Sequence, residues 1–273
     1  MRGKLLLFGD HAVVYGRPCL VAAIDRYVTV TLVNLIGRES AFVAAARKLF
    51  ESKYGPVKFG FKISGFSSRY GLGSSAAVTA AVAQAMFNLK KIKASQKELF
   101  DFCYQVVREV QGVGSGFDLA AAIYGGVVYF VTAGKTIDKL AVQDLPLVVG
   151  YSGVKADTAM MIKQAAIKID QQFLEQSEAI VKQARIALEQ KNWPVAGQLM
   201  NQDQVILNQI GVSTSKLDQM IKAALAAGAF GAKLSGAGGG DCMIALVSPA
   251  RREAVEKAIE QVGGEVIKVK LAL

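Results

Sequence analysis

The stretch Gly71-Leu72-Gly73-Ser74-Ser75-Ala76-Ala77 leads directly into an apolar run, residues 78–89, that has a helix-forming composition. Glycines let a backbone approach a ligand closely, and serines supply hydroxyls that can cap a helix. The free N–H groups and the positive dipole end at a helix start suit a phosphate. The stretch lacks the Gly-Lys-Ser/Thr of a Walker A loop and the spacing of a dinucleotide fingerprint. Taken alone, it fits either a phosphate-binding loop or a capped helix after a tight turn.

A second glycine-rich stretch, Ser235-Gly236-Ala237-Gly238-Gly239-Gly240-Asp241, lies inside a strand-like pattern over residues 232–246. Ordering so many glycines costs backbone entropy. The run therefore indicates close approach to a ligand or to another backbone segment, and a tight hairpin is the simpler alternative.

Two shorter segments present single reactive side chains. Residues 112–118 place the carboxylate of Asp118 after a flexible turn, where it would serve as a general base, a metal ligand or a helix cap. Residues 9–16 hold His11, the only histidine, and such a histidine more often makes a structural hydrogen bond than takes part in catalysis. Lys4 in the preceding strand is of a type normally found at the surface, but beside a phosphate it would hold negative charge.

Composition excludes several classes of protein. The 273 residues suffice for one large domain or two modest ones, and 52% of them are apolar. The net charge of +10 is scattered, with its densest cluster at residues 90–93, so we expect small anionic ligands such as nucleotides and no nucleic acid. The three cysteines form no C-x-x-C pair, which indicates reduced core cysteines and no zinc site. No apolar run is long enough to span a bilayer, so we expect a cytoplasmic protein without a membrane partner.

Periodicity and turn residues predict an α+β chain in two lobes, residues 1–145 and 146–273. A capping box, Ser95 with Glu98, predicts a helix that ends near Gly112. Strands are predicted at residues 4–8, 20–34, 126–131, 147–151, 232–246 (two strands around the glycine loop) and 266–271. Further helices are predicted at residues 78–89, 157–190, 195–209, 215–227 and 249–262.

In their order along the chain, these segments resemble the motifs of the GHMP kinase superfamily, and within it those of the mevalonate kinases most closely. Residues 4–16 are similar to the first motif, with Asp10 where glutamate is usual. Residues 71–77 are similar to the second motif and residues 233–241 to the third. Residues 110–118 and 199–214 are also similar to mevalonate kinases, so the resemblance covers nearly the whole chain.

The resemblance implies a fold and an activity. The N-terminal lobe would be like ribosomal protein S5 domain 2 and the C-terminal lobe ferredoxin-like, with the active site between them. The activity would be ATP-dependent phosphorylation of the mevalonate hydroxyl to 5-phosphomevalonate, in isoprenoid precursor biosynthesis. ATP and Mg²⁺ would be required, and a homodimer is a plausible assembly.

The resemblance also implies roles for individual residues. Asp118 would accept or orient the proton of the substrate hydroxyl. Lys4 would lower the pKa of that carboxyl and stabilise charge in the transition state. The ATP site would consist of Gly71, Leu72, Gly73, Ser74, Ser75 and Ala76, with Ser75 also holding Mg²⁺. The substrate would be contacted by His11, Ser235, Gly236, Ala237 and Gly238.

Two departures from the family pattern leave alternatives open. Many mevalonate kinases carry a magnesium-binding glutamate where this chain has Val107, and Glu109 lies roughly 200° further around a helix, so we do not expect it to substitute. The sequence of residues 114–122 resembles that of phosphomevalonate kinases. The alternatives are therefore a phosphomevalonate kinase, another GHMP small-molecule kinase, or a non-catalytic GHMP-fold ligand sensor.

Overall fold

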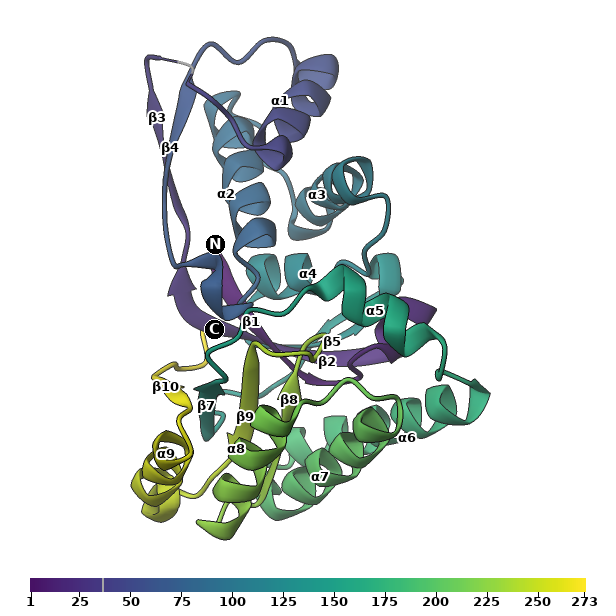
Figure 1. Ribbon diagram of the computed structural model, residues 1–273. Coiled ribbons are helices and arrows are strands. Elements are labelled where there is room, and N and C mark those ends of the chain that lie inside the picture. Colours follow the sequence, from purple (N-terminus) through teal and green to yellow (C-terminus); the bar gives the residue numbers. More distant parts are fainter. Residues whose placement is uncertain (36) are drawn as a thin grey trace.

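A computed structural model describes residues 1–35 and 37–273, and it mixes helices with antiparallel strands (Figure 1). The strands are β1 (Arg2–Phe8), β2 (Pro18–Tyr27), β3 (Thr29–Val33), β4 (Gly60–Ser64), β5 (Val127–Val131), β6 (Thr136–Lys139), β7 (Leu147–Tyr151), β8 (Gly231–Ser235), β9 (Cys242–Leu246) and β10 (Glu265–Ile267). The α-helices are α1 (Ala41–Tyr54), α2 (Ser74–Leu89), α3 (Gln96–Gln111), α4 (Phe117–Tyr124), α5 (Thr158–Ala166), α6 (Gln171–Glu189), α7 (Trp193–Gln209), α8 (Ser215–Ala226) and α9 (Arg252–Gln261).

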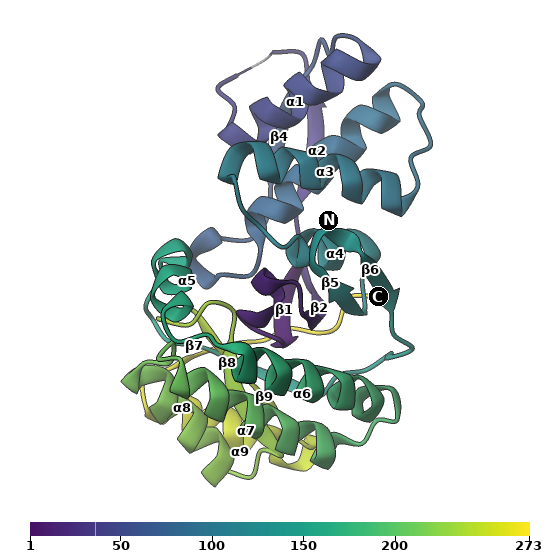
Figure 2. The same cartoon turned by 90° about the vertical axis from the view of Figure 1, so that its right-hand side faces the viewer.

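The strands form two four-stranded antiparallel sheets and one two-stranded antiparallel sheet. The first sheet has the order β1-β2-β5-β6 and the second the order β10-β7-β9-β8, while β3 pairs only with β4. Helices α1, α2 and α3 pack against one another at one end of the molecule. At the other end, α7, α8 and α9 pack on the second sheet, and α6 packs on α7 and on β1 and β2 of the first sheet (Figure 2). The α+β class is confirmed.

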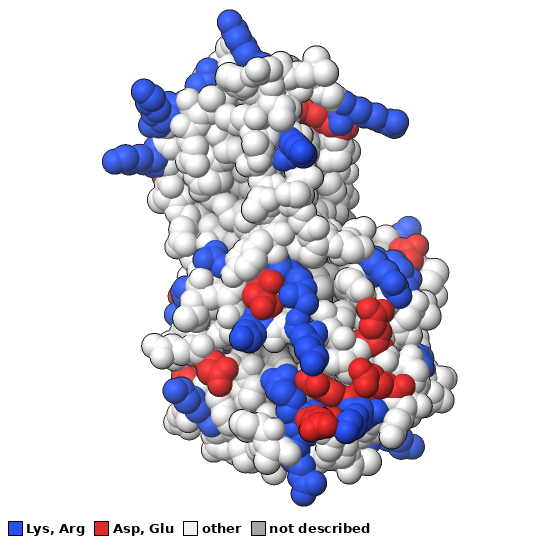
Figure 3. All heavy atoms as spheres, turned by 90° about the vertical axis from the view of Figure 1, so that its left-hand side faces the viewer, with Lys and Arg blue, Asp and Glu red and all other residues white. Residues whose placement is uncertain are grey.

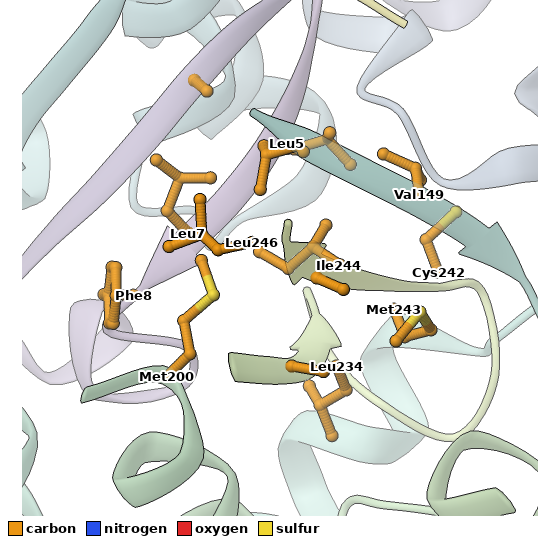
Figure 4. Close-up of a cluster of buried hydrophobic side chains, with 14 of the residues drawn as sticks. Leu5, Leu7, Phe8, Val149, Met200, Leu234, Cys242, Met243, Ile244 and Leu246 are labelled. Carbon is orange, nitrogen blue, oxygen red and sulfur yellow. The ribbon is translucent and has the colours of Figure 1, made fainter. Parts of the chain in front are cut away.

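Strand β1 separates the two main hydrophobic cores, because alternate residues of a strand point to opposite faces of its sheet. Leu5 and Leu7 point toward the second sheet, where they join Val149, Ile244 and their neighbours (Figure 4). Leu6 belongs to the other core, which α2, α3 and α4 cover. Lys4 shares the face of Leu6, so the pleat of β1 directs this lysine toward the start of α2 and α4.

Most predicted elements are confirmed, including the helix α3 with its capping box and its end at Gly112. The predicted helix over residues 157–190 is wrong as a single element: α5 ends at Ala166, and Asp170 begins α6 by accepting a hydrogen bond from the N–H of Phe173 at 2.8 Å. The helix predicted at residues 195–209 begins two residues earlier, because Trp193 and Pro194 form the first turn of α7. Proline fits there because the first N–H groups of a helix need no intrahelical acceptor.

The predicted lobe boundary at residue 145 falls between β6 and β7, that is, between the two sheets. It stays a prediction, because the end of the chain returns to the first sheet. The N–H of Ala272 donates to the carbonyl of Ala23 at 2.9 Å, and the N–H of Gly126 donates to that of Ala272 at 2.6 Å. The last predicted strand is accordingly shorter than expected: β10 ends at Ile267, and Leu271 forms an isolated bridge with Ile24.

The surface and the helices bear on possible partners. On the face drawn in Figure 3, Lys and Arg side chains of the lower half are interspersed with Asp and Glu. Elsewhere as well, exposed opposite charges pair, as in Arg69–Glu265 at 3.2 Å. Among residues 1–35 and 37–273, none of the helices combines the length and the apolar character that a membrane crossing requires.

Candidate active site

Lys4 lies at the junction of β1 with the glycine loop before α2. Its N–H donates to the carbonyl of Leu72 at 2.9 Å, which fixes the loop to the strand. A Cβ on Gly73 would lie 2.8 Å from Cγ of Lys4, so only glycine leaves room for this lysine. The Lys4 side chain is 10% exposed, and its Nζ lies 3.4 Å from Oδ1 of Asp118. The ammonium group is thus held next to the predicted general base.

Asp118 stands in the first turn of α4, after Gly116 at a φ of 95°. Its side chain is 37% exposed overall, but Oδ1 is buried and accepts no hydrogen bond from the residues that the structure describes. The Lys4 ammonium lies close to this oxygen without donating a hydrogen bond to it. A buried carboxylate oxygen with an open position is suited to accept a proton from a bound hydroxyl.

The start of α2 presents an anion-binding surface. Gly71 and Gly73 have φ values of 71° and 78°, and Gly73 is the N-cap, so no side chain caps the helix. The expectation that Ser74 or Ser75 caps α2 is therefore wrong, because both serines already lie within the helix. Ser74 is half-buried and Ser75 is exposed. The free N–H groups and these hydroxyls together fit a phosphate chain.

The third glycine loop packs mostly against the protein itself. A Cβ on Gly238 would lie 2.1 Å from the carbonyl oxygen of Val212, and one on Gly239 would lie 2.5 Å from the sulfur of Met161. Gly236 differs: its φ is 105°, and a Cβ added there would meet nothing within 4 Å. Of the two explanations offered for this loop, close approach to another backbone segment holds for Gly238. Close approach to a ligand at Gly236 stays a prediction, and the space beside this glycine is open.

Ser235, expected to contact substrate, instead joins the two sheets. Its hydroxyl donates to the carbonyl of Leu6 at 2.9 Å and accepts from the N–H of the same residue at 3.1 Å. The side chain is buried, and its donor is used within the protein. This geometry favours a role in holding β8 against β1, and a substrate contact by Ser235 stays a prediction.

His11 and Asp10 clamp the third loop to the first motif. Nε2 of His11 donates to the carbonyl of Ala237 at 2.9 Å, and Oδ1 of Asp10 accepts from the N–H of Gly236 at 2.7 Å. Burial lowers the pKa of His11, so the ring is neutral at pH 7. His11 itself has a φ of 61°, a conformation that costs a non-glycine residue energy and that the two clamping bonds maintain. Two predicted substrate-binding segments are thus brought together.

A further contact, which the sequence analysis does not predict, joins the glycine loop before α2 (residues 71–73) to the third glycine loop (residues 235–241). The carboxylate of Asp241 accepts from Nζ of Lys155 at 2.9 Å and from the N–H of Ala156 at 3.2 Å. The same carboxylate lies against Gly71, where a Cβ would approach Oδ2 to 2.3 Å. Asp241 ends the third motif in the sequence, but its contact with Gly71 is a tertiary one that spacing does not reveal.

Val107, which stands where a magnesium-binding glutamate was considered, has apolar surroundings. Val107 is buried in the core that α2, α3 and α4 share. Glu109 points elsewhere, with its carboxylate 3.5 Å from Nζ of Lys48 on α1. Among the residues that the structure describes, no three His, Cys, Asp or Glu side chains gather as a metal site. A magnesium ion would therefore depend on nucleotide phosphates, water and the Ser75 hydroxyl, which the open start of α2 allows.

Comparison with known proteins agrees with this geometry. Residues 40–126 match the family model described as GHMP kinases N terminal domain, and residues 184–265 match GHMP kinases C terminal. The mevalonate kinase of Pyrococcus abyssi is 31% identical over 96% of this chain and 91% of its own length. The mevalonate kinase of Thermococcus sibiricus is 32% identical over 98% of this chain and 94% of its own length. The chain belongs to the GHMP kinase family.

Solved structures of the family have the same fold. The Leishmania (L. major) mevalonate kinase in complex with R-mevalonate is 27% identical, with a TM-score of 0.85 and coverage of 99% of this chain and 94% of that one. The phosphomevalonate kinase of Streptococcus pneumoniae, in complex with phosphomevalonate and AMPPNP, has a TM-score of 0.89 at 22% identity, covering 100% and 98%, which shows the fold alone. As a member of this family the chain is an ATP-dependent small-molecule kinase, and Mg²⁺ accompanies ATP in its reaction.

Proposed function

We propose that this GHMP kinase phosphorylates the hydroxyl of mevalonate with ATP to give 5-phosphomevalonate. The observation that carries the proposal is the Lys4–Asp118 pair, 3.4 Å apart, at the point where the starts of α2 and α4 meet β1. The curated relatives at 31–32% identity that are named mevalonate kinase support mevalonate as the acceptor.

The chain's own residues would act as follows. The N–H groups at the start of α2 and the hydroxyls of Ser74 and Ser75 would bind the phosphates, and Ser75 would also contact Mg²⁺. Asp118 Oδ1 would take the proton of the acceptor hydroxyl as its oxygen forms the bond to phosphorus and ADP departs. Lys4 would stabilise the negative charge that develops on the transferred group. Magnesium, when bound with ATP, neutralises phosphate charge, and the remaining work is positioning.

The acceptor would lie near the clamp that His11 and Asp10 make with residues 236–237. The clamp holds residues 236–237 in place, and a Cβ added at Gly236 would meet open space.

The test is ADP formation with Mg²⁺-ATP, comparing mevalonate with 5-phosphomevalonate for the wild type and Asp118→Asn. We expect turnover on mevalonate, and a kcat roughly 10²–10⁴-fold lower in Asp118→Asn because the amide cannot accept the proton. Asp101→Asn is the matched control, since Asp101 lies on α3 with its side chain 47% exposed. Turnover on 5-phosphomevalonate alone would move the enzyme to the next phosphorylation, and an unimpaired Asp118→Asn variant would remove the proposed base.

Three earlier expectations stay predictions alongside this proposal. They are the homodimer, the cytoplasmic location, and the boundary between lobes 1–145 and 146–273.

A further inference from the structure

Three ionisable side chains lie completely buried behind the third glycine loop. They are Asp10 after β1, Asp203 on α7 and Lys233 on β8, with side chains 0%, 1% and 0% exposed. The Lys233 ammonium contacts Oδ2 of Asp10 and donates to the carbonyl of Leu234 at 2.7 Å. Its distance to Oδ2 of Asp203 is 3.5 Å. Lys233 is therefore bound to Asp10 and only adjacent to Asp203.

Asp203 has poor partners for an ionised buried carboxylate: the Lys233 ammonium and the N–H of Gly9 lie near it, but neither donates a hydrogen bond with good geometry. Neither of its oxygens accepts a hydrogen bond in the part of the chain that the structure describes. Asp10, by contrast, accepts from Lys233 and from the N–H of Gly236. Two carboxylates and one ammonium would bury a net charge of −1, and such a charge without hydrogen bonds costs several kcal/mol. Binding one proton removes that charge, and Asp203 is the carboxyl with the least stabilised anion.

We propose that Asp203 carries a proton at neutral pH, and that the resulting neutral cluster of Asp10, Lys233 and Asp203 positions the substrate-facing loop at residues 236–237. Asp203 and Lys233 are positioning residues in this proposal, because they act through Asp10. Burial raises the pKa of Asp203 to about 7, and Lys233 opposes that rise.

The route from the cluster to the site is short. Asp10 bonds to Lys233 through one oxygen and to the Gly236 N–H through the other. His11, the next residue, holds the carbonyl of Ala237. A second negative charge on Asp203 would compete with Asp10 for Lys233, and Asp10 is the group that orients the loop. Loss of the proton is thus expected to weaken acceptor binding more than the phosphoryl-transfer step itself.

The charges that face Asp203 come from two elements, and both belong to the cluster. They are Lys233 on β8 and Asp10 after β1, and the nearby His11 is kept neutral by burial. On α7 itself, the flanking polar side chains are amides. Asn201 accepts from the N–H of Ala232 at 3.0 Å, and Gln204 accepts from the N–H of Leu234 at 2.9 Å. These two amides attach α7 to β8, so this attachment does not depend on the carboxyl of Asp203.

The proton itself is tested without any turnover. Protein labelled with carbon-13 at the aspartate carboxyls is titrated by NMR from acid to pH 9. We expect one carboxyl resonance with a midpoint near that of Asp203, about 7. It should be absent from Asp203→Asn and present in the matched control Asp101→Asn. If every aspartate carboxyl of the wild type titrates in the ordinary acidic range, the proposal is overturned, and that result does not depend on whether the variant folds.

The positioning role is tested by kinetics, and this part rests on the proposed function. For the wild type, kcat/KM for the acceptor should fall above pH 7, by up to ~10-fold per pH unit, mainly through a rise in KM. Asp203→Asn, which keeps the shape of the protonated side chain, should lack this alkaline fall while retaining activity at pH 7. An identical alkaline limb in both proteins would refute the positioning role. If the acceptor proves to be a different molecule, the NMR result stands alone and the kinetics are repeated with that acceptor.

Discussion

At the scale of single residues, the site depends on the absence of a side chain at Gly73. Its φ of 78° is unfavourable for other residues, and a Cβ there would lie 2.8 Å from Cγ of Lys4. We expect Gly73→Ala to displace Lys4 from Asp118 and to lower kcat about 10²-fold, as loss of one preorganised charge-stabilising group does. Steady-state ADP formation measures this effect.

The control for this prediction is Gly112→Ala. Gly112 has a φ of 71°, but a Cβ there meets nothing within 4 Å. Both variants carry similar backbone strain, of the order of 1 kcal/mol, and only Gly73→Ala adds the clash with Lys4. Equal kcat values in the two variants would show that Gly73 matters for the backbone alone.

A second residue-scale prediction concerns pH and stability. Burial raises the pKa of Asp203 to about 7, above its value of ~4 in an unfolded chain, so the folded protein binds an extra proton between these two pH values. The stabilisation from this proton is complete below pH ~4 and is lost as pH rises to about 7. The free energy of unfolding of the wild type relative to Asp203→Asn should therefore fall by roughly 1.4 kcal/mol per pH unit across that window. Urea unfolding at several pH values measures it, and a difference that is constant with pH would contradict the assignment.

These residues show what the sequence could and could not predict. Lys4, Asp118 and the loop at 71–77 were predicted because motifs preserve order and spacing along the chain. The contacts of Lys233 with Asp10 and of Asp241 with Gly71 join residues more than 150 positions apart. No local pattern encodes them. The burial of Asp203 is also not encoded locally. Its neighbours in the sequence are typical of a surface position on a helix, and only the packing of α7 on β8 removes it from water.

At the scale of elements, the third glycine loop combines two kinds of glycine. Gly238 is required because its Cβ would collide with the carbonyl oxygen of Val212 at 2.1 Å, while Gly236 has φ 105° and open space around it. We expect Gly238→Ala to destabilise the protein clearly more than Gly236→Ala, since both add backbone strain of about 1–2 kcal/mol and only Gly238→Ala forces backbone segments apart. Thermal unfolding of the two variants provides the comparison.

Catalysis should separate the same pair in a different way. Gly236 donates its N–H to Asp10 and lies on the acceptor side in the proposed function. Gly236→Ala is therefore expected to raise KM for the acceptor, with a smaller loss of stability than Gly238→Ala. If Gly236→Ala were less stable than Gly238→Ala, the distinction between a structural Gly238 and an open Gly236 would be wrong. Element boundaries in this region were predicted well, because β9 is the short apolar run typical of a buried strand and the glycine run marks where β8 ends. The break between α5 and α6 was missed, because residues 167–169 (Ile-Lys-Ile) contain no glycine or proline and only Asp170 signals a new start.

At the scale of the whole molecule, the two predicted lobes share one hydrophobic core. Leu5 and Leu7 of β1 pack with residues of β7 and β9, so the first sheet buries one face against the second half of the chain (Figure 4). Ser235 adds two hydrogen bonds from β8 to β1, and the last residues pair with β2. A fragment of residues 1–145 would expose the Leu5–Leu7 face and would lose the pairing with Ala272.

We therefore expect this fragment not to fold cooperatively on its own. Each buried leucine contributes roughly 1.5–3 kcal/mol, so exposing several apolar side chains removes stability comparable to the 5–15 kcal/mol of a typical domain. Urea unfolding followed by circular dichroism, on residues 1–145 and on the full chain, measures this. A sharp transition in the fragment would mean that residue 145 is a true domain boundary. A broad, low-amplitude change would mean that the sheets fold as one unit, because the strand that carries Lys4 on one face is stabilised by the other half of the chain on its opposite face.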